Sequence, residues 1–105
     1  MTDVLAQLSA TIAARRGADP ASSYVAKLLH EGTPLAARKL GEEAVETVVA
    51  ALSGTTADLT GEAADLIFHL AVLLESRNVP LSDVLDELRR REGVSGIVEK
   101  AARGA

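Results

Sequence analysis

The segment from residue 63 to residue 74, AADLIFHLAVLL, limits the folds open to this chain more than any other stretch. It does not alternate between apolar and polar positions as a half-buried strand would. Wound as a helix, it is apolar on almost all sides, which is typical of a helix buried among other elements rather than one lying on a surface. The segment therefore predicts a fold in which other helices surround it.

Four further segments also carry apolar residues at helical spacing, and turn-forming residues separate them. No run alternates as a strand does, so we expect an all-α fold, a bundle of about five helices in a single domain, residues 1–105. Residues from about 93 onward are expected to form a C-terminal tail with another turn or two of helix. The expected helices run from about Val4 to before Gly17, over residues 22–31 before Gly32, from Pro34 to about Ser53 with Thr33 as N-cap, from about Ala57 to Arg77, and from Ser82, as N-cap, to Gly93.

The composition favours assembly of more than one copy of the chain. Apolar residues make up 48% of the sequence, yet the only aromatic residues are Tyr24 and Phe68. The core must therefore be built from Leu, Val, Ile and Ala, in a chain at the small end of the single-domain range. Such a core often continues into a partner subunit, so we expect a homodimer.

Charge and residue usage exclude several classes of partner and chemistry. The net charge is −4 without a polybasic run, so nucleic acid is not an expected partner. The absence of cysteine excludes disulfides, thiolate metal sites and thiol nucleophiles. The longest apolar run, residues 70–74, is too short to span a membrane, and no signal peptide is recognisable. We expect a soluble, cytoplasmic protein.

Three carboxylates lie close together in the expected helix from Pro34 to about Ser53. Glu42, Glu43 and Glu46 form like-charge pairs at i,i+3 and i,i+4 spacing, each of which costs a few tenths of a kcal/mol in a helix. Lys39, three positions before Glu42 and four before Glu43, is the candidate in the sequence for a cation that intervenes between them. Either this face is simply solvated, or a positive charge that the sequence does not contain lies there.

The next helix carries a second acidic stripe. At about 100° per residue, Asp58, Glu62, Asp65 and His69 fall on one narrow side of it. Carboxylates on a buried helix must be paired, hydrogen-bonded or bound to metal. The short connection favours antiparallel packing of the two helices, which lets their acidic stripes converge. A cluster of oxygen ligands alone suits a hard cation, so the sequence predicts a site for Mg²⁺, with Mn²⁺ as a second possibility.

These residues also resemble a known signature. Glu42-Glu43-x-x-Glu46, followed after fifteen residues by Glu62-x-x-Asp65, is similar to the EExxE…ExxD pattern of the MazG-like group of all-α nucleoside triphosphate pyrophosphohydrolases. Within this superfamily the closer match is the phosphoribosyl-ATP pyrophosphohydrolase family. The segments that carry the resemblance are residues 22–29, 39–51, 62–74, 81–91 and 95–103, which together cover most of the chain.

The resemblance implies Mg²⁺-dependent hydrolysis of phosphoribosyl-ATP to phosphoribosyl-AMP and pyrophosphate, the second step of histidine biosynthesis, by a dimer with a helical-bundle fold. This chemistry requires neutralising a triphosphate, holding a water in line and stabilising the charge on the leaving pyrophosphate. The carboxylates can supply these functions through metal ions. The candidate metal ligands are Glu43, Glu46, Glu62 and Asp65, and the candidate catalytic carboxylates are Glu42 and Glu43, with Glu42 either a further ligand or the base that takes a proton from water.

Other polar residues are candidates for supporting roles. Lys39 and Lys27 are candidates for phosphate binding. His69, one turn after Asp65, is either a hydrogen-bonded core histidine or a group that orients Asp65 from behind. Further cations that could reach the site from the same or the partner subunit are Arg89, Arg90, Arg91, Lys100 and Arg103.

Each interpretation has a simpler rival. Lys39 could only relieve carboxylate repulsion, and Arg89 to Arg91 could only compensate a helix dipole. The chain departs from the family pattern at Arg91-Glu92-Gly93, where a His is expected before the glycine, and around residues 21–23. Two other functions remain open: a MazG-like pyrophosphohydrolase for canonical or modified nucleotides, and a non-catalytic helical dimerisation module.

Overall fold

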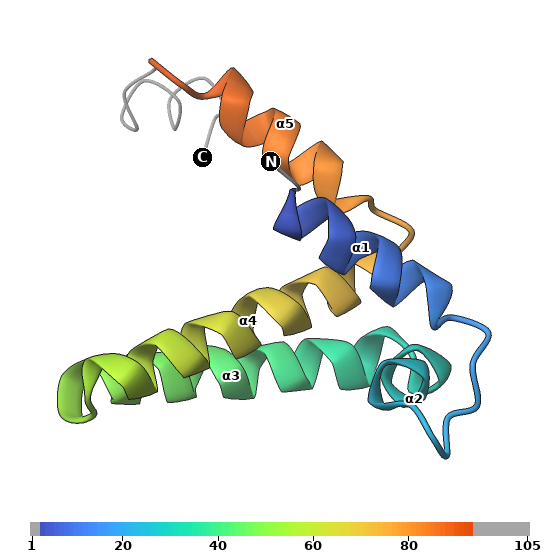
Figure 1. The fold of residues 1–105 in the computed structure, drawn as a ribbon, viewed down its shortest axis with the longest axis horizontal. Coiled ribbons are helices and arrows are strands. Elements are labelled where there is room, and N and C mark those ends of the chain that lie inside the picture. Colours follow the sequence, from blue (N-terminus) through green and yellow to red (C-terminus); the bar gives the residue numbers. More distant parts are fainter. Residues whose placement is uncertain (1–2, 94–105) are drawn as a thin grey trace.

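The structure, a computed structural model, describes residues 3–93, and these residues form helices and no strand. The expected all-α fold with five helices is thus confirmed for this part of the chain (Figure 1). Among these residues no helix is both long and apolar enough to cross a membrane. The helices are α1 (Val4–Ala14), α2 (Tyr24–Glu31), α3 (Thr33–Ser53), α4 (Thr56–Ser76) and α5 (Leu81–Arg90).

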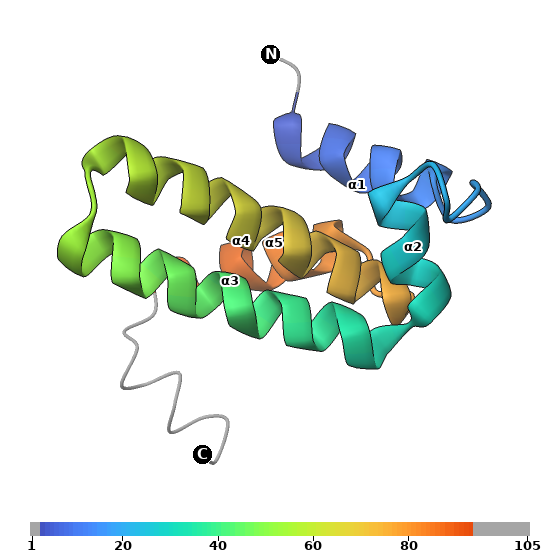
Figure 2. The same cartoon turned by 90° about the horizontal axis from the view of Figure 1, so that it is seen from below.

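Helices α3 and α4 form a long antiparallel hairpin, whose tip projects away from the other helices (Figures 1 and 2). Only Gly54 and Thr55 connect the two helices. The Thr55 hydroxyl accepts from the Asp58 N–H, while the Asp58 carboxylate accepts from the Thr55 N–H, so α4 begins with a capping box. A Cβ at Gly54 would lie 3.0 Å from the Ala50 carbonyl oxygen and from the Asp58 carboxylate. Glycine therefore permits the tight connection that makes the helices antiparallel.

The buried core lies at the base of this hairpin. There α1 and α2 pack against the second half of α4 and the start of α3, and α5 extends beside α1 (Figure 1). Because four helices contribute to one cluster, this end of the hairpin is fixed in place. The buried residues of the cluster are Ile12, Leu28, Ala36, Ala71 and Val72.

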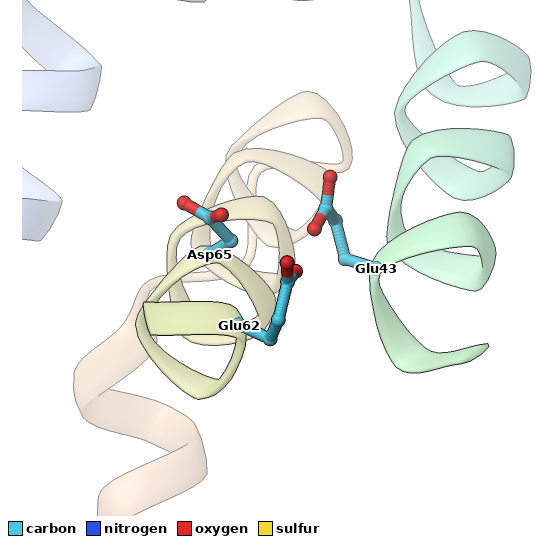
Figure 3. Close-up of side chains that lie close together, drawn as sticks. All are labelled: Glu43, Glu62 and Asp65. Carbon is cyan, nitrogen blue, oxygen red and sulfur yellow. The ribbon is translucent and has the colours of Figure 1, made fainter. Parts of the chain in front are cut away.

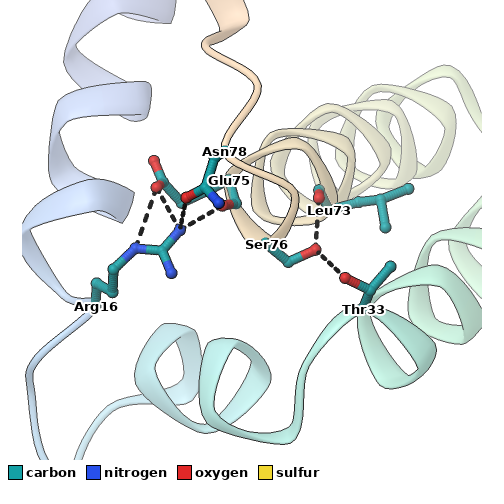
Figure 4. A network of polar contacts seen from close by, with 6 residues as sticks. All are labelled: Arg16, Thr33, Leu73, Glu75, Ser76 and Asn78. Carbon is teal, nitrogen blue, oxygen red and sulfur yellow. Dashed lines mark hydrogen bonds and ion pairs between the residues drawn. The ribbon is translucent and has the colours of Figure 1, made fainter.

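Polar contacts close the end of α4 at this base (Figure 4). Arg16, which follows α1, donates to the Glu75 carboxylate at 2.6 Å, to the Glu75 carbonyl oxygen and to the Asn78 side chain. The Thr33 and Ser76 hydroxyls lie 3.0 Å apart and connect the start of α3 to the end of α4. Asn78, at φ 60°, adopts the left-handed conformation just after the helix. These contacts fix α1 and α3 relative to the C-terminal end of α4.

The tip of the hairpin leaves apolar side chains exposed. Near the tip Leu52 is 83% exposed, and further along α4, toward the base, Ile67 is 45% exposed. We expected other helices to surround residues 63–74. This expectation is confirmed for the second half of the segment, where His69, Ala71 and Val72 are buried, but it is wrong for the first half within a single chain. On α3 the exposed apolar face consists of Val45, Val48, Val49 and Leu52.

Two expected N-caps are wrong. Gly32, at φ 91°, precedes α3, and Thr33 is its first residue, with its hydroxyl directed to Ser76. Helix α5 begins at Leu81, because this side chain is buried against the base, and Pro80 rather than Ser82 occupies the N-cap. That helix also ends at Arg90, before the expected Gly93. The expected C-terminal helical turns lie outside the described residues.

Candidate functional site

Three carboxylates from two helices meet near the middle of the hairpin. Glu43 comes from α3, and Glu62 and Asp65 lie one turn apart on α4 (Figure 3). One oxygen from each carboxylate lies within 4.8 Å of the others. The predicted convergence of the two acidic stripes is thus confirmed for these three residues, which we call the acidic cluster.

A threonine fixes the two helices against each other at this level. The Thr47 hydroxyl lies 2.8 Å from the Glu43 carbonyl oxygen on its own helix and 3.2 Å from the Glu62 carbonyl oxygen on α4. Both acceptors are main-chain atoms of residues in the acidic cluster. The sequence analysis did not identify Thr47, although its position one turn after Glu43 on the α4 side was a detectable signal.

Two oxygens of the acidic cluster are buried without a hydrogen-bond partner among the described residues, namely Oε2 of Glu43 and Oε2 of Glu62. Burial is the main cause that raises the pKa of both carboxyls above the usual value, and the neighbouring Glu46 raises them further. Buried carboxylate oxygens without donors are unfavourable unless a proton or a cation neutralises them. The residues present therefore fit a hard divalent ion with oxygen ligands.

The remaining predicted carboxylates divide between two positions. Glu46 is exposed but close enough to Glu43 and Glu62 to raise the pKa of both through hydrogen bonding and charge. Glu42 is directed to two cations instead, with its carboxylate 3.5 Å from the Lys39 Nζ and 3.9 Å from the Arg38 Nε. Glu46 thus borders the acidic cluster, whereas Glu42 lies beside it among basic side chains.

His69 is buried and connects α4 to α2. Its Nδ1 lies 2.7 Å from the Asp65 carbonyl oxygen, and its Nε2 lies 2.8 Å from the Tyr24 hydroxyl. A carbonyl oxygen can only accept, so Nδ1 carries a proton and donates to it, while Nε2 and the Tyr24 hydroxyl share a second hydrogen bond. The ring therefore contacts the main chain of Asp65 and not its carboxylate. An orienting effect of His69 on Asp65 stays a prediction, and the sequence analysis did not identify Tyr24 as the partner of His69.

The predicted basic residues lie in two places. Lys27 and Lys39 line one groove between α2 and α3. The arginines at the C-terminal end of α5 pair with carboxylates of this helix: Arg89 with Asp86 at 2.6 Å, and Arg90 and the C-cap Arg91 with Glu87 at 2.8 and 3.1 Å. Hydrogen bonds from Arg90 and Arg91 lower the pKa of Glu87 to about 2. Lys100 and Arg103 lie outside the described residues.

Without divalent cations, we expect the melting temperature to decrease as the pH rises from about 5 to 8. The raised pKa of Glu43 and Glu62 means that the folded chain binds protons more tightly than the unfolded chain. The resulting stability is fully present below the usual pKa of 4.5 and is lost as the pH rises through the folded-state values. Thermal unfolding in EDTA at several pH values measures this dependence.

The double variant Glu43→Gln/Glu62→Gln is the control for other titrating groups. Its melting temperature should depend less on pH than that of the unsubstituted protein, because the two carboxyls no longer titrate. Equal slopes for both proteins would contradict the assignment of buried charge to this cluster.

Comparison with known proteins shows that this sequence is similar to a described family and to named proteins. A family model described as phosphoribosyl-ATP pyrophosphohydrolase matches residues 5–92. A phosphoribosyl-ATP pyrophosphatase of Rhizorhabdus wittichii is 64% identical over 98% of this chain and 97% of its own length. Proteins of the same name are 63% identical in Erythrobacter litoralis, over 97% of this chain and 98% of the relative, and 60% identical in Novosphingobium aromaticivorans, over 96% and 94%.

Proposed function

The chain belongs to the phosphoribosyl-ATP pyrophosphohydrolase family of the MazG-like all-α superfamily, and we propose that it hydrolyses phosphoribosyl-ATP to phosphoribosyl-AMP and pyrophosphate with Mg²⁺ as cofactor. The observation that carries this proposal is the pair of buried, partnerless oxygens on Glu43 and Glu62, within reach of Asp65. This arrangement is unfavourable for a helix hairpin alone, but it is suited to binding a cation.

We assign different roles in the reaction to the acidic cluster and to its neighbours. Glu43, Glu62 and Asp65 would hold Mg²⁺, and Glu46, which borders the cluster, would be a further ligand. When bound, the ion supplies positive charge opposite the triphosphate and the leaving pyrophosphate. For Glu42, which is exposed beside the cluster, we propose the role of the base that accepts the proton of the attacking water.

We further propose that two copies assemble through the tip of the hairpin, in the cytoplasm. The apolar face formed by Val45, Val48, Val49 and Leu52 is exposed in the single chain. These valine and leucine side chains are of the kinds that form protein cores, and contact with a second copy would remove them from water. The face adjoins the acidic cluster through Glu46 and Glu62, which line the same groove as Val45 and Val49.

A substrate panel tests the reaction. With millimolar Mg²⁺, we expect the protein to release pyrophosphate from phosphoribosyl-ATP far faster than from canonical or modified nucleoside triphosphates. EDTA should abolish the release, because the acidic cluster then has no cation. Pyrophosphate release is measured by a coupled phosphate assay.

The panel also separates the alternatives. Equal or faster hydrolysis of ordinary or damaged nucleotides would replace the proposed substrate with that of a housekeeping pyrophosphohydrolase. A protein that hydrolyses nothing in the panel, and whose melting temperature Mg²⁺ does not change, would be a non-catalytic helical module.

A further inference from the structure

A groove between α2 and α3 carries an excess of positive charge. It encloses about 350 Å³, at the lower end of the size range of small-molecule sites, which runs from about 300 to 1,000 Å³. Three cations and a single carboxylate line it, and two leucines and a tyrosine supply apolar surface. The lining residues are Tyr24, Lys27, Leu28, Glu31, Leu35, Arg38 and Lys39.

The cations of this basic groove are weakly compensated. Lys39 and Arg38 share one carboxylate, that of Glu42, at 3.5 and 3.9 Å, and the side chain of Arg38 is 68% exposed. Exposed ion pairs of this length contribute little free energy. Lys27 forms no ion pair with any residue from 3 to 93. The groove can therefore accept an anion without first breaking a strong internal contact.

A chain of hydrogen bonds connects the basic groove to the main chain of the acidic cluster. Tyr24 lines the groove, and its hydroxyl binds His69, whose other ring nitrogen binds the main chain of Asp65. Lys39 lies one turn before Glu43 on α3. The charges of Lys39, on one side, and of Glu43, on the other, both act on the Tyr24 hydroxyl, whose pKa burial raises. A molecule of nucleotide size could thus contact both regions at once.

We propose that the basic groove binds the phosphate of the phosphoribosyl group of the substrate, through Lys27 and Arg38. This inference rests on the proposed function and extends it to the recognition of the substrate. A phosphoribosyl nucleotide has two anionic ends, and only its triphosphate can be held through cations at the acidic cluster. The second phosphate would be repelled by those carboxylates and requires basic side chains at a distance. Leu35, which is half-buried, offers apolar contact to the sugar.

The groove also accounts for discrimination against ordinary triphosphates. ATP lacks the second phosphate, so it leaves the cations of the groove without a ligand. Charge-assisted hydrogen bonds to a phosphate are among the stronger polar contacts in proteins. The structure therefore assigns selectivity to α2 and the start of α3, and bond cleavage to the acidic cluster.

The double variant Lys27→Gln/Arg38→Gln tests the inference. Loss of two charge-assisted contacts should raise KM for phosphoribosyl-ATP by about tenfold to a hundredfold, with kcat changed by less than about threefold. Inhibition by ribose 5-phosphate should weaken to a similar extent, whereas inhibition by pyrophosphate should not change. Both side chains are exposed, so circular dichroism and the melting temperature should match the unsubstituted protein.

Arg15→Gln is the matched control, since Arg15 is exposed at the end of α1 and does not line the groove. If the double variant keeps its KM and its sensitivity to ribose 5-phosphate, the inference is wrong. If inhibition by pyrophosphate weakens equally, the groove holds the triphosphate end and the inference is again overturned. Failure of the unsubstituted protein to hydrolyse phosphoribosyl-ATP would instead overturn the proposed function.

Discussion

Glu62→Gln is expected to reduce phosphoribosyl-ATP hydrolysis by about a hundredfold or more, while making the Mg²⁺-free protein more stable at neutral pH. The side chain keeps its volume but loses the negative charge that binds the cation. Its Oε2 is buried without a partner next to Glu43, so removing the charge relieves both desolvation and repulsion. Opposite changes in activity and stability are not expected from a residue that merely supports the fold.

Three measurements check this result: the initial rate of pyrophosphate release, the melting temperature in EDTA, and the rise in melting temperature caused by Mg²⁺. A ligand that binds only the folded state raises its stability by mass action, and the variant should lose most of this rise. Glu92→Gln, an equal change of charge at an exposed position, should behave as the unsubstituted protein.

Asp65→Asn separates the two effects within the acidic cluster. Asp65 contributes an oxygen to the cluster but is exposed, so we expect a comparable loss of activity with little gain in stability. Near-normal hydrolysis by both Glu62→Gln and Asp65→Asn would show that the converging carboxylates are not the catalytic metal site.

Leu52→Asp is expected to convert the proposed homodimer to monomers at micromolar concentration. Leu52 is 83% exposed near the tip of α3, and the variant would place a carboxylate in an apolar interface, twice in a symmetric dimer. Each buried, unpaired charge costs several kcal/mol, which corresponds to at least a hundredfold weaker association. Sedimentation should give about twice the 10.9 kDa chain mass for the unsubstituted protein and a single chain for the variant.

Val4→Asp provides the control, because Val4 is also an exposed apolar residue, at 71%, but lies on α1. It should remain dimeric. An unsubstituted protein that sediments as a single chain would contradict the dimer, and a dimeric Leu52→Asp variant would move the interface to another surface.

Local sequence signals were sufficient for the helices and for the hairpin. Apolar spacing depends only on the helical period. Gly32 and Asn78 end helical segments at positive φ, and Gly54 ends α3 in an extended conformation, so these ends depend on local residue preferences. The short connection after Ser53 favours antiparallel packing of the two long helices. The convergence of carboxylates from residues 43 and 62 to 65 followed from this packing.

Burial and long-range contacts were decided by the tertiary structure. Glu42 and Glu43 are adjacent in sequence and therefore about 100° apart on α3. The rotation of α3 against α4 directs Glu43 into the acidic cluster and Glu42 toward Arg38 and Lys39. This rotation cannot be predicted from helical spacing, because the rotation depends on the contacts that α3 makes with the other helices.

The contact between Tyr24 and His69, which are 45 positions apart, also depends on how separate helices pack. The start of α5 does so too, because the helix begins at the buried Leu81 and not after Ser82, the residue that the capping preference favours. Sequence periodicity likewise predicted that α3 has an apolar face, but not that this face would be exposed at the tip of the hairpin. A helical pattern reports which residues share a side of one helix, whereas the partner of that side depends on how separate helices pack in space.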